Sequence, residues 1–66
     1  MTTADHEAAD ERFRRFRHDL ANPLSAILAE TQLLLLRADT LDSETVTSLK
    51  EIEGLARRMR DIMSQG

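Results

Sequence analysis

From Phe13 onward, apolar side chains recur at intervals of three and four residues, with polar residues between them. This interval is the period of an α-helix, whereas a half-buried strand repeats every second residue. The pattern predicts a first helix that ends at about Arg37. Its expected buried positions are Phe13, Phe16, Leu20, Leu24, Ile27, Leu28, Thr31, Leu34 and Leu35. Residues 1–11, "MTTADHEAADE", form an acidic leader that we expect to be helical or frayed.

A second helix is predicted after the turn-forming stretch "ADTLDSE", in which Asp42 and Ser43 are the candidate N-caps. Beyond it, steps of three and four residues indicate a heptad seam made of Leu49, Ile52, Ala56, Met59 and Met63. This seam is widened to one side by Val46, Leu55 and Ile62. We expect the helix to end near Ser64. On its exposed face, Glu53 and Arg57 have the spacing of a stabilising i,i+4 ion pair.

Two helices joined by a short loop pack as antiparallel neighbours. Each predicted apolar stripe is wider than one partner helix covers, and a chain of 66 residues without cysteine has neither a large core nor disulfides to stabilise it. We therefore expect an all-α fold, in which residues 12–64 form an antiparallel two-helix hairpin. Two copies of this hairpin are expected to form a homodimeric four-helix bundle.

Composition excludes several classes of function. A net charge of -3 and only two aromatic residues, both phenylalanine, are unlike a nucleic-acid binder, and two helices are too few for a helix-turn-helix domain. The longest apolar run, Leu33 to Leu36, is far shorter than the roughly 20 residues that span a bilayer. Without a signal-peptide pattern, the expected location is the cytoplasm. His6 and Asp10 alone make too weak a metal site, so none is assigned.

One polar line runs along the first helix, within "FRHDLANPLSAI", residues 16–27. His18 is turned away from the core-facing Phe16 and Leu20, and Asn22 and Ser25 continue its face. A neutral imidazole is a nucleophile, and a neighbouring carboxylate such as Asp19 accepts a proton from its second nitrogen during attack. The alternative is a solvent-exposed histidine with no role.

Pro23, the only proline, lies in the same helix one turn after Asp19. It has no amide hydrogen, and its ring crowds the carbonyl of Asp19, so we expect it to bend the helix beside the histidine. A proline inside a helix costs about 3 kcal/mol relative to alanine. A functional reason to keep the proline despite this cost would be a hinge that lets the histidine-bearing segment move.

The stretch "HDLANPL" resembles the H-box of sensor histidine kinases, in their dimerisation and histidine-phosphoacceptor domain. In that motif histidine is followed by Asp or Glu, then by Asn or Thr, Pro and Leu; Ala21 departs from it, because many members have a basic residue there. The resemblance implies that His18 accepts a phosphoryl group, that Asp19 activates it and that Asn22 orients water during dephosphorylation of a response regulator. Pro23 is implied as the helix kink.

The resemblance also implies partners. Members of the family are homodimeric four-helix bundles that work with a separate ATP-binding kinase domain, in cis or in trans, and pass the phosphoryl group to the receiver domain of a response regulator. No cofactor is expected in this chain, because ATP and magnesium would be bound by that separate domain. Small residues suited to close approach of a partner helix are Ala21, Ser25, Ala26 and Ala29.

Three interpretations of the function stay open. The chain is a piece of a histidine kinase, which we favour, or a standalone histidine phosphotransfer protein. The third is a non-catalytic dimerisation module that binds a partner helix, in which His18 is replaceable.

Overall fold

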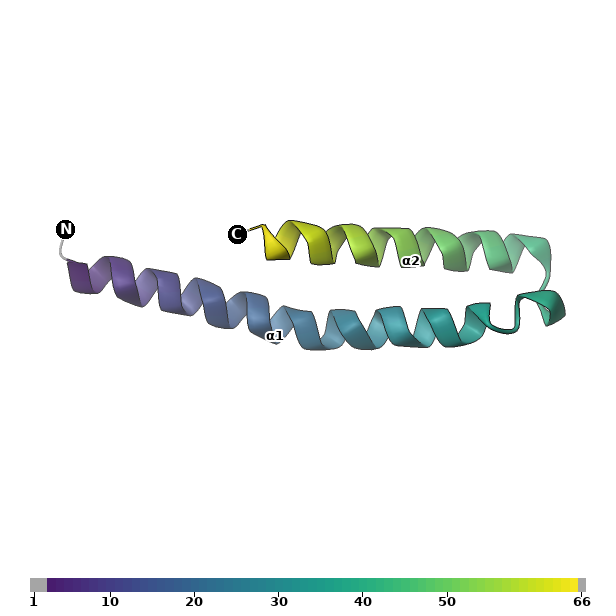
Figure 1. Ribbon diagram of the computed structural model, residues 1–66, viewed down its shortest axis with the longest axis horizontal. Helices are drawn as coiled ribbons and strands as arrows, with labels where there is room; N and C mark the ends of the chain where they lie inside the picture. Colours follow the sequence, from purple (N-terminus) through teal and green to yellow (C-terminus); the bar gives the residue numbers. More distant parts are fainter. Residues whose placement is uncertain (1–2, 66) are drawn as a thin grey trace.

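The chain folds as a hairpin of two antiparallel α-helices, shown in Figure 1 by a computed structural model that describes residues 3–65. Helix α1 spans Thr3–Leu35, a single 3-10 turn η1 spans Ala38–Thr40, and helix α2 spans Ser43–Ser64. The described residues contain no strand. The hairpin is 58 Å long and only 14 × 12 Å in cross-section. The expected all-α hairpin is confirmed.

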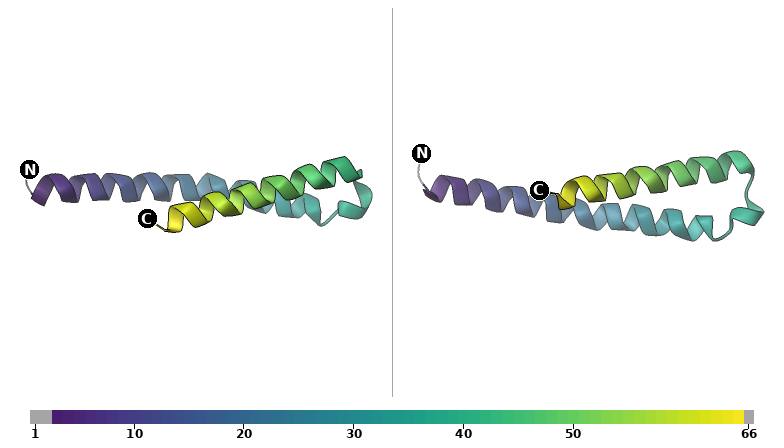
Figure 2. Two further views of the ribbon diagram at one scale, coloured as in Figure 1. Left: turned by 90° about the horizontal axis from the view of Figure 1, so that it is seen from above. Right: turned by 45° about the horizontal axis from the view of Figure 1, so that its top comes forward.

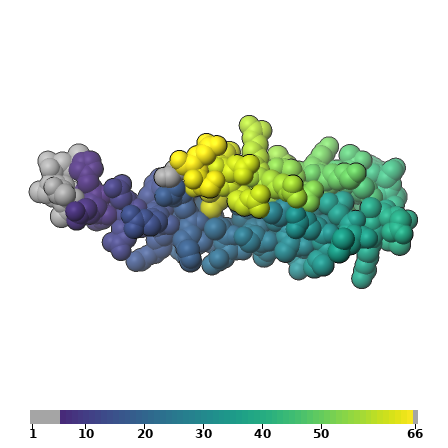
Figure 3. Space-filling model, in the orientation of Figure 1, coloured from purple at the N-terminus to yellow at the C-terminus, as the bar shows by residue number. Residues whose placement is uncertain are grey.

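Helix α2 lies along the second part of α1, and the first part of α1 projects beyond it (Figures 1 and 3). The two axes cross at a small angle (Figure 2, left). The projecting part includes most of the acidic leader, which is helical from Thr3. Met1 and Thr2 of the predicted leader lie outside the described residues. None of the described helices combines the length and the hydropathy needed to cross a membrane.

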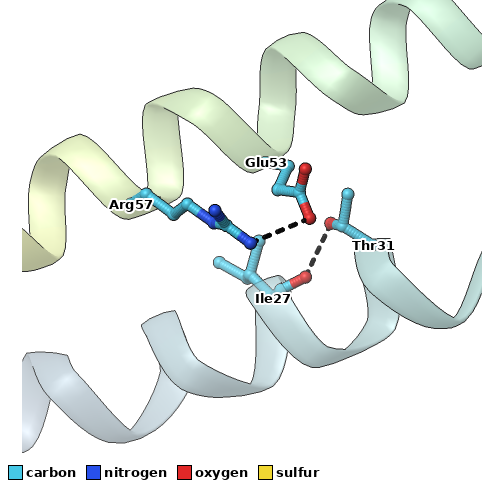
Figure 4. A network of polar contacts seen from close by, with 4 residues as sticks. All are labelled: Ile27, Thr31, Glu53 and Arg57. Atoms are coloured by element: carbon cyan, nitrogen blue, oxygen red, sulfur yellow. Dashed lines mark hydrogen bonds and ion pairs between the residues drawn. The ribbon is translucent and has the colours of Figure 1, made fainter. Parts of the chain in front are cut away.

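A narrow seam holds the two helices together. Leu24, Leu28 and Thr31 of α1 are buried against Ala56 of α2, and Met63 packs at one end of this cluster. The small side chain of Ala56 lets the helices approach closely. The hydroxyl of Thr31 donates a hydrogen bond to the carbonyl of Ile27 at 2.7 Å, so this buried polar group is satisfied within its own helix (Figure 4).

Above this seam, Arg57 and Glu53 of α2 form the predicted i,i+4 ion pair, with a nitrogen–oxygen distance of 3.5 Å (Figure 4). The Glu53 side chain is only 24% exposed, so this pair borders the seam instead of standing on the outer face. A half-exposed pair of this kind stabilises a helix by a few tenths of a kcal/mol.

Two residues of the predicted α2 seam do not face α1 in the single chain. Ile52 and Met59 are 42% and 51% exposed in the single chain, although their spacing placed them in the heptad seam. Helix α2 has two apolar stripes, and the sequence pattern merged them. One stripe, which faces α1, contains Val46, Leu49, Ala56 and Met63. The other is exposed and contains Ile52, Leu55, Met59 and Ile62.

Helix α1 ends two residues before the expected Arg37. The amide of Leu36 still donates to the carbonyl of Gln32, but the amide of Arg37 donates to the carbonyl of Leu34, three residues back. The last turn therefore tightens into 3-10 geometry before η1, a common way to end an α-helix. Differences of one or two residues at such an end are within the usual uncertainty of helix limits.

Pro23 lies inside a continuous α1, which runs without interruption from Thr3 to Leu35. Figure 1 shows α1 changing direction near its middle, in the stretch coloured blue. A proline removes one amide donor and crowds the preceding turn, which bends a helix without ending it. The expected bend is present, whereas its role as a hinge stays a prediction.

Of the two N-cap candidates that the sequence offered for α2, the structure has Asp42 as the N-cap. Its side chain accepts a hydrogen bond from the amide of Thr45 at 2.8 Å. Hydrogen bonds from Thr45, first by its side chain and then by its backbone, lower the pKa of Asp42 below its ordinary value of 3.8. This carboxylate stabilises the fold above the ordinary pKa, and the contribution is lost as the pH falls through the lower pKa of the folded state.

Replacing Asp42 by asparagine is expected to keep the cap but remove its pH dependence, because asparagine caps helices as well as aspartate does. Thermal unfolding followed by circular dichroism at pH 7 and at about pH 3 measures this. The midpoint should fall less on acidification in Asp42→Asn than in the parent. The control is Asp39→Asn, in η1, which should behave as the parent. Equal acid sensitivity of Asp42→Asn and the parent would exclude a contribution from the charged cap.

Candidate functional site

His18 stands on the outer surface of α1, with a side chain that is 76% exposed. Asp19 follows it, and its side chain is 70% exposed. The Nδ1 atom of His18 and the Oδ1 atom of Asp19 are 3.7 Å apart, which is longer than a hydrogen bond. The carboxylate thus lies on the Nδ1 side of the imidazole. A small rotation of either side chain would close this gap, and Nε2 is the nitrogen left for reaction.

The predicted polar line of His18, Asn22 and Ser25 is exposed along α1. Asn22, one turn after His18, is exposed, as are Ala26 and Ala29. Of the predicted partner-binding residues, Ala21 and Ser25 border the same hollow as His18, whereas Ala26 and Ala29 do not. The groove beside the histidine therefore includes two of the four predicted partner-binding residues.

This hollow is a groove between α1 and the last turns of α2, with a volume of about 280 Å³. Sequence reasoning did not identify the α2 residues that form its second wall. The signal was available, because an antiparallel pairing through a short loop brings the end of α2 back toward the middle of α1. The groove is lined by Arg14, Arg17, His18, Ala21, Leu24, Ser25 and Leu28 of α1, and by Arg60, Met63 and Ser64 of α2.

Arg17 fixes the reactive turn to the end of α2. Its Nη1 donates a hydrogen bond to the carbonyl of Met63 at 3.2 Å, and its guanidinium lies 5.6 Å from the centre of the Phe13 ring. A cation beside the last carbonyls of a helix is favourable because of the helix dipole. The Nε atom of Arg17 is buried without a hydrogen-bond partner. The residue before His18 therefore joins the two helices.

The side of the hairpin opposite the groove is apolar. Both helices carry a stripe of exposed apolar residues. In each helix, these residues come immediately before residues that face the other helix, as Ile27 precedes Leu28 and Leu55 precedes Ala56. Successive residues turn by about 100° in one sense, so in antiparallel helices both stripes reach the same side. We call it the apolar face; its members are Phe16, Leu20, Ile27, Leu34, Ile52, Leu55, Met59 and Ile62.

His18 lies away from the apolar face. It immediately follows Arg17, which faces α2, just as Ser25 follows the buried Leu24. Residues that follow the seam and residues that precede it point to opposite sides of the helix. An association through the apolar face therefore leaves His18 and the groove in contact with solvent.

Metal-binding chemistry has little support among the residues described. Within residues 3–65, no three side chains of His, Cys, Asp or Glu are grouped closely enough to hold an ion. The pair His18 and Asp19 offers an exposed imidazole nucleophile beside a carboxylate that can accept a proton.

Comparison with known proteins agrees with this arrangement. Residues 9–65 match the family described as His Kinase A (phospho-acceptor) domain, or HisKA, whose known arrangement is a dimeric helical bundle. No curated protein and no solved structure matches the chain significantly. The family match covers α1 from residue 9 onward, all of α2 and the groove between them. The chain therefore belongs to the HisKA family and has the phosphoacceptor and dimerisation role of that domain in the histidine kinases of two-component signalling.

Proposed function

We propose that His18 is the phosphoacceptor and that its phosphoryl group passes to an aspartate of a response regulator. The observation that carries this proposal is the exposed imidazole with the Asp19 carboxylate 3.7 Å from its Nδ1 atom. The position of the carboxylate gives the two ring nitrogens different tasks. Nε2 attacks, and Nδ1 gives up its proton.

In the first step, the lone pair of Nε2 attacks the terminal phosphorus of ATP presented by a kinase domain. The nitrogen–phosphorus bond forms as the bond from phosphorus to the bridging oxygen breaks, and ADP leaves with that electron pair. Asp19 accepts the Nδ1 proton, so the product imidazole stays neutral.

In the second step, a carboxylate oxygen of the regulator attacks the same phosphorus. The nitrogen–phosphorus bond breaks, its electron pair returns to the ring of His18, and Asp19 returns the proton to Nδ1. Asn22 is exposed one turn away, and its proposed role is to orient water when the phosphorylated regulator is hydrolysed. These roles complete a cycle in which His18 is regenerated.

The partner surfaces follow from the two sides of the hairpin. A second copy of the chain covers the apolar face, because eight large apolar side chains, each at least 38% exposed, are costly to leave in water. The kinase domain and the receiver domain reach His18 from the other side. Ala21 and Ser25 present little bulk there, and Ala26 and Ala29 extend the small-residue surface. Pro23 is the proposed hinge between phosphorylation and dephosphorylation.

The test is to incubate the chain with the ATP-binding domain of a histidine kinase and with ATP labelled on its terminal phosphate. We expect one label per chain that is lost in acid and stable in alkali, as for a nitrogen–phosphorus bond. Adding a receiver domain should move the label to that protein. A label that is stable in acid, or no label at all, would favour the non-catalytic dimerisation module.

A further inference from the structure

Arg14 is one turn before His18 on the same face of α1, because residues four apart are neighbours on a helix surface. It borders two separate hollows beside the histidine. One is the groove, and the other is an outer hollow of about 290 Å³ lined by Glu11, Arg14, Arg15 and His18. Arg14 and His18 are the two residues that the hollows share. Among the arginines that line these two hollows, only Arg14 borders both.

Arg60 adjoins the same groove from α2, so cationic groups come from both helices. The third arginine of the groove, Arg17, is already engaged with the Met63 carbonyl and the Phe13 ring. Within residues 3–65, the side chains of Arg14 and Arg60 have neither an ion pair nor a hydrogen bond. Their guanidinium groups are therefore available to a ligand.

We propose that Arg14 and Arg60 are further catalytic residues that bind the phosphoryl oxygens at His18, one from each wall of the groove. This inference rests on the proposed phosphorylation of His18. A phosphoryl group in transfer spreads negative charge over three oxygens, and a neutral imidazole offers nothing to balance it. Guanidinium groups bind such oxygens through two parallel hydrogen bonds.

The shape of the groove suits this task. Its floor between the arginines is apolar, formed by Ala21 and by the buried Leu24 and Leu28. Apolar surroundings strengthen the attraction between opposite charges. The single methyl group of Ala21, three residues after His18, leaves room for the phosphoryl group. The bonds made and broken are those of the proposed transfer, and both arginines keep their protons throughout.

The test uses phosphoramidate, a small donor that phosphorylates histidine without a kinase domain, and measures the rate of His18 phosphorylation. Arg14→Ala and Arg60→Ala should each lower this rate about tenfold, less than the loss from a fully enclosed oxyanion site because the groove is open to water. Millimolar guanidinium in solution should restore much of the rate in both variants. Circular dichroism verifies that each variant keeps the helical signal of the parent.

Matched controls are Arg12→Ala on α1 and Arg58→Ala on α2. Each removes one exposed arginine from the same helix, and neither residue lines a hollow that includes His18. Their rates should stay within about twofold of the parent, because only a distant, screened charge is lost. Equal losses in controls and test variants, or no rescue by guanidinium, would overturn the proposal while leaving His18 as the acceptor. A parent chain that phosphoramidate does not modify at His18 would overturn the proposed function and this inference together.

Discussion

Replacing His18 by alanine is expected to abolish phosphorylation while leaving the helices and their association unchanged. The side chain is 76% exposed and does not belong to the buried cluster, so its removal costs little stability. Without the imidazole, no other group on this face is a plausible acceptor. Labelling with ATP and a kinase domain measures acceptance, and circular dichroism and sedimentation measure the fold and the association.

The chain contains a matched control for this experiment. His6 is the only other histidine and stands exposed near the start of α1, so His6→Ala should be labelled as well as the parent. Asp19→Asn gives an intermediate case, because an amide leaves His18 in place but cannot accept its proton. Loss of a general base lowers rates about 10²- to 10⁴-fold. An acid-labile label of parent intensity in His18→Ala would refute the assignment of the acceptor.

Much of this site was predictable from local sequence. All four residues of the motif, His18, Asp19, Asn22 and Pro23, lie within one helix. The helical period of 3.6 residues determines which of their side chains share a face. The Asp42 cap and the pair of Glu53 and Arg57 are local in the same way. Features that depend on residues three or four apart can therefore be inferred without knowing how the helices pack.

The groove and the seam of α2 were less predictable, because they depend on the rotation of one helix against the other. The period reveals that α2 has apolar positions at 52, 56 and 59 but does not say which of them face α1. The structure turns the small Ala56 toward α1 and leaves Ile52 and Met59 exposed. The contact of Arg17 with the Met63 carbonyl joins residues 46 positions apart, so no local pattern signals it.

The second large effect is expected from a substitution in the exposed apolar stripe of α2. Replacing Ile52 by aspartate is expected to dissociate the proposed dimer, although the substitution lies outside the contacts between α1 and α2 of one chain. Ile52 belongs to the apolar face and not to the seam, so in a homodimer it meets the other copy. A carboxylate buried there without a partner costs about 3 kcal/mol or more.

A twofold dimer buries each substituted position twice, so the dissociation constant should rise by about 10⁴-fold. Sedimentation at micromolar concentration should show a dimer for the parent and a monomer for Ile52→Asp. The control is Leu36→Asp, the same kind of change at a leucine that is 80% exposed and lies outside the apolar face. It should remain dimeric. Ala56→Asp places the charge in the seam instead and should unfold the hairpin itself, because Ala56 is only 4% exposed. If Ile52→Asp sediments as the parent does, a second copy does not cover the apolar face.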